Sequence, residues 1–227
     1  MPIADFHRDI IKLALAAVRR KGISDVALGG GNALIARADS LRPTRDVDFC
    51  CRDPASVGPA ALEIAEAARA AGYQVVQRDD EDRWWDEAEG EMVELVVSTP
   101  GDKPAEVEVQ VAYFLYTEDS DLDDLGPVLS LDDLAGLKTT CLGNRREDRD
   151  YVDYMVLRRK YSTERLFELA AERDPGLTAE DYADAARYLD ELDDADLAPY
   201  LAPGQDAAEV RAAFNDWPRA VPSRRGE

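Results

Sequence analysis

The stretch GGGNALIARADSLRPTRDVDF, residues 29–49, decides how this chain folds. Three glycines separate a short apolar run from a second one, and glycine allows the sharp backbone turn that joins a strand to a helix. At the end of the stretch, Asp46 and Asp48 alternate with apolar residues, which indicates a strand that carries two carboxylates on one face. The pattern predicts a strand, a glycine turn, a helix and a second strand, which is the start of an α/β domain.

The two carboxylates of this second strand need a partner. Neighbouring carboxylates repel each other, and both stay ionised when a metal ion or a cationic side chain lies beside them. One interpretation is a metal site built on Asp46 and Asp48. The alternative is a surface salt-bridge network with Arg42, Arg45 or Arg52.

A third carboxylate is available on the segment AEVEVQVAYF, residues 105–114. On a strand, Glu106, Glu108 and Gln110 share one face, so a glutamate joins the two aspartates if this strand lies beside residues 46–51. Three carboxylates suit two Mg²⁺ ions, which prefer oxygen ligands and clamp the attacking and leaving oxygens of a phosphoryl transfer. We favour Glu108 over Glu106 as the third ligand; the alternative is a polar strand face turned to solvent.

The glycine turn predicts a phosphate site. Amide groups at the start of a helix and the helix dipole attract negative charge, and glycine lets a phosphate approach the backbone. Gly30, Gly31 and Asn32 are therefore the predicted nucleotide-binding residues. The turn is neither a P-loop nor the dinucleotide fingerprint, and glycine also occurs in such turns for conformational reasons alone.

The remaining chain divides into two regions. Up to about residue 125, apolar spacing and glycine stops predict alternating helices and strands. The predicted helices there cover residues 4–21, 32–38 and 54–72, and the predicted strands cover 46–51, 73–78, 92–99 and 105–114. From about residue 126 only helices are predicted, at 130–142, 146–160, 163–173, 178–192 and 206–216. We therefore predict an α/β domain over residues 1–125 and a helical domain over 126–227, joined by the Asp-rich segment 117–127.

Composition excludes several classes of protein. The 227 residues hold 27 Lys plus Arg against 48 Asp plus Glu, a net charge of -21, which argues against a general nucleic-acid coat protein. Three cysteines and one histidine leave no ordinary zinc site, disulfide framework or histidine-based nucleophile. The first residues form neither a signal peptide nor a membrane span, so we expect a soluble cytoplasmic protein without a membrane partner.

A family resemblance rests on these motifs. Residues 29–49 resemble the DNA polymerase β-type nucleotidyltransferase superfamily, in which a glycine turn on a helix precedes Asp-x-Asp on a strand. Within it, the Gly30–Leu34 and Thr44–Asp48 segments resemble the AbiEii-type toxin nucleotidyltransferases. The later stretch DLAGLKTTCLGNRREDRDYVDYMVL, residues 133–157, is similar to that family's helical lysine followed by Arg-Asp-x-x-Asp. The matching positions are Lys138, Arg149, Asp150 and Asp153.

The resemblance implies a polymerase β-like sheet and Mg²⁺-dependent transfer of a nucleotide from an NTP to an acceptor. It implies metal ligation by Asp46, Asp48 and Glu108, and nucleotide contacts by Arg45, Arg149 and Asp150. Family members act as toxins beside a cognate antitoxin, and some modify tRNA ends, so an RNA or protein acceptor is expected. Superfamily members often have Ser after the first glycine, where this chain has Gly31 and then Asn32.

The later motif also has a physical interpretation. Lys138 lies in a predicted helix and could neutralise charge on transferred phosphates, which makes it a catalytic candidate. Arg149 and Asp153 lie four residues apart, so an alternative is an Arg/Asp network that fastens the helical domain. Two other functions stay open: a catalytically idle nucleotide-binding module of the same fold, and a small-molecule nucleotidyltransferase of the aminoglycoside type, whose cationic acceptor the net charge would attract.

Overall fold

The structure is a computed structural model, and it describes residues 3–38, 40, 42–78, 92–117, 119–122 and 125–219. Contacts divide these residues into two compact units. The sheet unit contains residues 3–37 and 44–130, and the helical unit contains residues 38–43 and 131–219. The chain therefore crosses between the units three times. The division into domains 1–125 and 126–227 stays a prediction.

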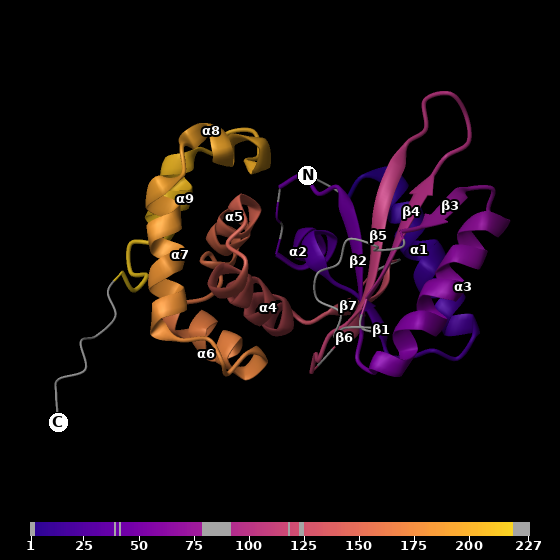
Figure 1. Ribbon diagram of the computed structural model, residues 1–227, viewed down its shortest axis with the longest axis horizontal. Helices are drawn as coiled ribbons and strands as arrows, with labels where there is room; N and C mark the ends of the chain where they lie inside the picture. Colours follow the sequence, from indigo (N-terminus) through magenta and orange to yellow (C-terminus); the bar gives the residue numbers. More distant parts are fainter. Residues whose placement is uncertain are drawn as a thin grey trace. The chain divides into compact units, whose positions relative to one another are not determined.

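The sheet unit is built on one mixed sheet, which has seven strands among the described residues (Figure 1). Its strands are β1 (Val26–Leu28), β2 (Asp46–Cys51), β3 (Gln74–Gln77), β4 (Met92–Ser98), β5 (Glu106–Tyr113), β6 (Asp119–Leu122) and β7 (Gly126–Leu129). They lie in the order β3-β4-β5-β2-β1-β7-β6. β2 pairs with β5 in parallel and with β1 in the antiparallel sense. The Asp-x-Asp strand is thus internal to the sheet, with partners on both sides.

Three α-helices of the sheet unit are α1 (Asp5–Arg20), α2 (Gly30–Ala38) and α3 (Val57–Ala70), and a 3₁₀ turn, η1 (Pro54–Ser56), precedes α3. α1 and α3 pack side by side beside the sheet (Figure 1). On α1 the buried positions include Ile10, Ile11 and Ala14, which recur at helical spacing. These helices confirm the predictions made from apolar periodicity.

The segment predicted as a joint is different in the structure. Residues 117–127 contain β6 and the start of β7, which pair with each other at one edge of the sheet. The sequence failed to indicate these strands because both are short and lack apolar alternation, and β6 is also Asp-rich. β7 ends in Val128 and Leu129, which are completely buried, so tertiary burial outweighs the local composition.

The helical unit confirms the prediction of an all-helical carboxy-terminal region. Its α-helices are α4 (Leu131–Asn144), α5 (Asp148–Leu157), α6 (Thr163–Arg173), α7 (Ala179–Glu191), α8 (Asp194–Leu197) and α9 (Ala207–Ala213), and a 3₁₀ turn, η2 (Ala198–Tyr200), follows α8. The ring of Phe214 lies 5.4 Å from that of Tyr151, 4.4 Å from that of Tyr154 and 5.0 Å from that of Trp217. This aromatic cluster forms much of the core of the unit.

In the described part of the chain, no helix combines the length and the apolar character that crossing a bilayer requires. The cysteines Cys50, Cys51 and Cys141 are free thiols. Cys50 and Cys51 are buried on β2, where they serve as small apolar side chains.

Replacing Phe214 tests the core of the helical unit. Because its ring is fully buried among three other rings, we expect Phe214→Ala to lower the free energy of unfolding by about 3–5 kcal/mol. The control Leu62→Ala truncates a side chain that is 56% exposed, and it should change stability by less than about 0.5 kcal/mol. Urea unfolding measures both values, and equal losses would contradict this description of the core.

Candidate active site

The glycine turn lies directly against the second aspartate of β2. Gly29 N–H donates to the carbonyl of Asp48 at 2.8 Å, which joins the end of β1 to β2. Gly30 has φ +58°, and a Cβ atom placed on it would lie 1.6 Å from Oδ2 of Asp48. Only glycine fits here, because a side chain would occupy the position of the carboxylate. The turn and the Asp-x-Asp strand therefore form one site.

The first aspartate is held by polar neighbours. Asn32, on the first turn of α2, is completely buried and donates from Nδ2 to the carbonyl of Asp46 at 2.7 Å. The hydroxyl of Thr44 donates to Oδ1 of Asp46 at 2.7 Å. Gly31 is buried on the same turn as Asn32. The predicted phosphate-binding segment and the predicted metal-binding strand are thus connected through backbone and side-chain bonds.

The third carboxylate was predicted by strand alternation, and the register of the sheet places it beside the first. Asp46 is paired with Glu108 across β2 and β5, and Asp48 is paired with Gln110. The carboxylate of Glu108 lies 2.6 Å from Nη2 of Arg78. Among the described residues no group of three acidic, His or Cys side chains is close enough to hold a metal. The donor set of Asp46 and Asp48 fits a hard divalent cation, whereas Glu108 is turned to a cation of its own chain.

His7, the one histidine of the chain, was missed by sequence reasoning. It is buried on α1, and burial lowers the pKa of its imidazole, while the Asn32 side chain and the charge of Asp46 act in the opposite direction. Oδ1 of Asn32 and Nδ1 of His7 are buried, and neither atom forms a hydrogen bond of normal geometry with a described residue. A lone histidine in an amphipathic helix gives no sequence signal for this position.

Two of the three arginines considered as alternative partners of the aspartates have other contacts. Arg52 lies 3.1 Å from Asp119 and stacks over the ring of Tyr116 at 4.4 Å. Arg45 is exposed on the segment before β2. Arg42 belongs to the helical unit, where its partner is a different carboxylate.

That carboxylate is Asp153, which is completely buried on α5. Arg42 donates to it from Nε at 2.7 Å and from Nη2 at 3.2 Å, and Nζ of Lys138 lies 2.8 Å from its Oδ2. Burial acts to lower the pKa of Lys138, but the charge of Asp153, with a smaller contribution from Asp150, outweighs it and raises that pKa. Lys138 is therefore a charged ammonium group in a buried ion cluster.

The Arg/Asp network predicted on α5 has different members from those expected. Arg149 lies 2.7 Å from Glu147, and Asp153 is held by Arg42 and Lys138 instead. Asp150 is fully buried, closes the capping box of α5 with Glu147, and accepts two bonds from Arg145 at 3.1 and 2.9 Å. Sequence spacing compared residues of one helix, so it could not identify the partners that other parts of the chain supply.

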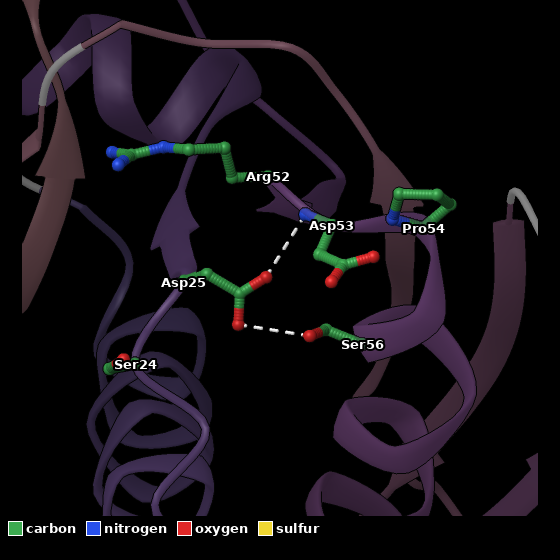
Figure 2. A pocket seen from close by; sticks show the side chains of 6 residues that line it. All are labelled: Ser24, Asp25, Arg52, Asp53, Pro54 and Ser56. Atoms are coloured by element: carbon green, nitrogen blue, oxygen red, sulfur yellow. Dashed lines mark hydrogen bonds between the residues drawn. The ribbon is translucent and has the colours of Figure 1, made fainter.

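A shallow pocket lies at the other end of the β1–β2 pair, and six residues line it: Ser24, Asp25, Arg52, Asp53, Pro54 and Ser56 (Figure 2). Asp25 accepts from the amide of Asp53 and from the hydroxyl of Ser56, both at 3.0 Å (Figure 2). Register pairs Val26 with Cys51 here, whereas the glycine turn lies at the opposite end of β1. The hydrogen bonds of Asp25 therefore join the segment before β1 to the turn before α3. The pocket that these residues line is separate from the Asp-x-Asp site.

A glycine turn that starts a helix, packed against an Asp-x-Asp strand inside a mixed sheet, defines the nucleotidyltransferase class of fold. The profile of one family, described as the nucleotidyl transferase AbiEii toxin of type IV toxin–antitoxin systems, matches residues 13–216. The chain belongs to this family of nucleotidyltransferase toxins and is a nucleotidyltransferase. No curated protein sequence matches it.

Solved structures agree with this fold. The JHP933 protein of Helicobacter pylori is similar with a TM-score of 0.59 at 15% identity, over 95% of this chain and 91% of that one. MenT4, a nucleotidyltransferase toxin from Mycobacterium tuberculosis, is similar with a TM-score of 0.59 at 15% identity, over 92% of this chain and 82% of that one. At this identity the likeness concerns the fold alone.

Gly30 provides a test of the close approach to Asp48. Gly30→Ala should lower the free energy of unfolding by about 1–3 kcal/mol, because alanine is strained at φ +58°. It should also reduce nucleotide transfer by roughly 100-fold or more, because Asp48 must move. The matched control Gly58→Ala, on α3 with open space around its Cβ position, should leave transfer unchanged and should not lower stability. Urea denaturation measures the stability of each variant, and a transfer assay measures its activity. Normal nucleotide transfer by Gly30→Ala would contradict the proposal that the glycine turn positions Asp48.

The Asp153 cluster predicts a pH dependence of stability. Burial alone would raise the pKa of Asp153, but Lys138 and Arg42 together lower it below the ordinary value. Such a carboxylate stabilises the fold above its unfolded pKa, about 3.9, and this contribution is lost as pH falls through the folded pKa. Asp153→Asn should therefore cost roughly 3–5 kcal/mol at pH 7.

The difference in unfolding free energy between wild type and Asp153→Asn should shrink below about pH 4, where the unfolded carboxyl is protonated. Urea unfolding from pH 7 to pH 3 measures it. Asp102→Asn, at an exposed turn position, is the control and should match wild type throughout. A difference that stays constant over this range would exclude the ion cluster as its cause.

Proposed function

We propose that this nucleotidyltransferase moves a nucleoside monophosphate from an NTP to an acceptor, with Mg²⁺ held by Asp46 and Asp48. The observation that carries the proposal is the close approach of Gly30 to the Asp48 carboxylate, which supports a phosphate site at the glycine turn beside two carboxylates that could hold the metal. The transferred phosphate and the metal would then share one position on the sheet unit.

Each proposed site residue of the sheet unit has a role that follows from its chemistry. The amides of Gly30, Gly31 and Asn32 would orient the triphosphate at the start of α2. The side chain of Asn32 binds the backbone carbonyl of Asp46 and the hydroxyl of Thr44 binds its carboxylate, so Asp46 is positioned before a metal binds. Bound Mg²⁺ would stabilise the charge that develops on the attacking and leaving oxygens.

The reaction has a defined balance of bonds. A nucleophile of the acceptor forms a bond to the α-phosphorus, and the bond from that phosphorus to the bridging oxygen breaks. Pyrophosphate leaves with the electron pair, and the nucleophile releases its proton to solvent. Lys138 is proposed to bind phosphate charge, with Arg45, Arg149 and Asp150 as further nucleotide contacts; these roles rest on the sequence motifs.

Glu108 is proposed as the third metal ligand because its register is level with Asp46. This role requires that its side chain leave Arg78, a pair that is about half exposed and therefore weakly held. Glu106, which pairs with Ser98 at the end of β5, is further along the strand.

The acceptor and the partner follow from the family. An RNA end, such as that of tRNA, or a protein group is the proposed acceptor, and an antitoxin encoded beside this toxin is the proposed partner. A small cationic acceptor is the second candidate, because a net charge of -21 attracts cations and repels RNA.

Transfer from each of four α-³²P-labelled NTPs tests the proposal, with total tRNA, the protein itself and an aminoglycoside mixture as acceptors. Asp46→Asn and Asp48→Asn should each reduce labelling by at least roughly 100-fold, because each removes a ligand charge. EDTA should abolish labelling and added Mg²⁺ should restore it. Glu108→Gln should lose more activity than Glu106→Gln.

The control Asp102→Asn changes charge equally at an exposed turn, and its labelling should equal that of wild type. Label on tRNA or protein favours the family acceptors, and label on the aminoglycosides favours the cationic one. Absence of label with metal-dependent NTP binding would favour the idle binding module. Absence of NTP binding would reject the site.

A further inference from the structure

The start of β2 is held on one side by a side chain instead of a strand. The pairing of β1 with β2 runs from Cys51 to Phe49. Beyond it, the amide of Gly29 donates to the carbonyl of Asp48, and Nδ2 of Asn32 donates to the carbonyl of Asp46 at 2.7 Å. These two carbonyls are two residues apart and point to the same side of the strand. The amide of Asn32 therefore replaces the next residue of β1 and fixes the backbone at the first aspartate.

The other end of the Asn32 amide faces a buried histidine. Asn32 is completely buried, and His7, on the first turn of α1, is 7% exposed. Neither Oδ1 of Asn32 nor Nδ1 of His7 has a hydrogen bond of normal geometry among the described residues. Leaving such buried polar atoms without a partner is unfavourable. An acceptor and a potential donor are thus both incomplete next to the bond that holds Asp46.

The two side chains lie within reach of each other. Burial has the largest effect on the imidazole of His7 and lowers its pKa, whereas a hydrogen-bond interaction with the Asn32 side chain and the charge of Asp46 act to raise it. The lowered pKa makes the imidazole neutral above about pH 7. A neutral imidazole carries one proton, and the neighbouring group decides which nitrogen holds it.

The orientation of Asn32 selects the tautomer of His7. Nδ2 of Asn32 must face the carbonyl of Asp46, because the amide oxygen in that position would bring two acceptors together. Oδ1 then needs a donor. The Nδ1–H tautomer of His7 supplies it, whereas the Nε2–H tautomer would place a lone pair beside Oδ1.

We propose that His7 is a positioning residue for nucleotide transfer: its Nδ1–H donates to Oδ1 of Asn32, and this bond holds the Asn32 amide against the backbone of Asp46. The effect on transfer rests on the proposed function, whereas the hydrogen bond itself does not. The role assigned to His7 involves no contact with the nucleotide or the metal. It acts through Asn32 on the strand that carries the first candidate ligand.

The proton of His7 can be located by NMR without interference, because His7 is the one histidine of the chain. Long-range ¹H–¹⁵N correlation spectra of the untagged protein at about pH 8, where the imidazole is neutral, distinguish a protonated Nδ1 from a protonated Nε2. We expect the Nδ1–H form in wild type and a shift toward the Nε2–H form in Asn32→Ala. A proton on Nε2 in wild type, or an unchanged Nδ1–H form in Asn32→Ala, would overturn the proposal.

Variants of His7 test its effect on transfer. His7→Leu removes the donor and should reduce transfer roughly tenfold, which corresponds to one lost hydrogen bond. His7→Asn places an amide donor near the position of Nδ1 and should recover to within about threefold of wild type. His7→Gln, whose amide reaches the position of Nε2 instead, should stay low. A merely structural role of His7 does not predict rescue by Asn alone.

Two controls separate positioning from packing. Leu15→Ala truncates another buried side chain of α1 and should lower stability without changing transfer by the folded protein. In an Asn32→Ala background, His7→Leu should cause little further loss of transfer, because the bond that it breaks is already absent. Additive losses would contradict the proposal. If His7→Leu does not fold, the comparison of His7→Asn with His7→Gln decides.

Failure of this inference and failure of the proposed function give different results. An Nδ1–H form that depends on Asn32, without nucleotide transfer to any acceptor, would reject the proposed function and keep the hydrogen bond between His7 and Asn32. Metal-dependent transfer that is unchanged in folded His7→Leu would reject the positioning role and keep the proposed function.

Discussion

The contact between the backbone of Gly30 and the carboxylate of Asp48 is the constraint on which the sheet unit depends. It requires a residue without a Cβ at φ +58°, and it requires β2 to run beside β1 in one register. A shift of β2 by one residue would turn both aspartates into the apolar face and Val47 and Phe49 out of it. The same register brings Glu108 level with Asp46 on the neighbouring strand β5. The fold and the candidate metal site are thus specified by one strand alignment.

Buried charge is treated differently in the two units. In the sheet unit, the aspartates of β2 are half-buried, and Asp46 is positioned by Asn32 and Thr44. In the helical unit, Asp153 is completely buried and neutralised by cations from distant parts of the chain. Half-buried carboxylates can bind a metal from solvent, whereas a fully buried one organises its cations. This difference in burial explains why aspartates serve as candidate metal ligands in the sheet unit and as the partner of buried cations in the helical unit.

Much of the fold was predictable because local physics agrees with it. Apolar periodicity defines α1, α3 and α7, and alternation defines β2, β4 and β5. The strands β6 and β7 were missed because both are short and neither shows apolar alternation, and the burial of Val128 and Leu129 becomes apparent only in the sheet. Likewise, spacing on α5 indicated that Asp153 was important, but its partner Arg42 lies 111 residues away.

The sequence by itself determined the nucleotidyltransferase class, the glycine turn and the two aspartates, because these depend on residue types at short spacing. Tertiary structure alone decided that Asn32 holds Asp46, that Glu108 contacts Arg78, and that Lys138 shares a buried carboxylate. The physical reason is that a side chain's charge and hydrogen bonds are completed by whichever groups the folded backbone brings within a few ångströms. Chain separation has no influence on that choice, so composition and spacing could not predict it.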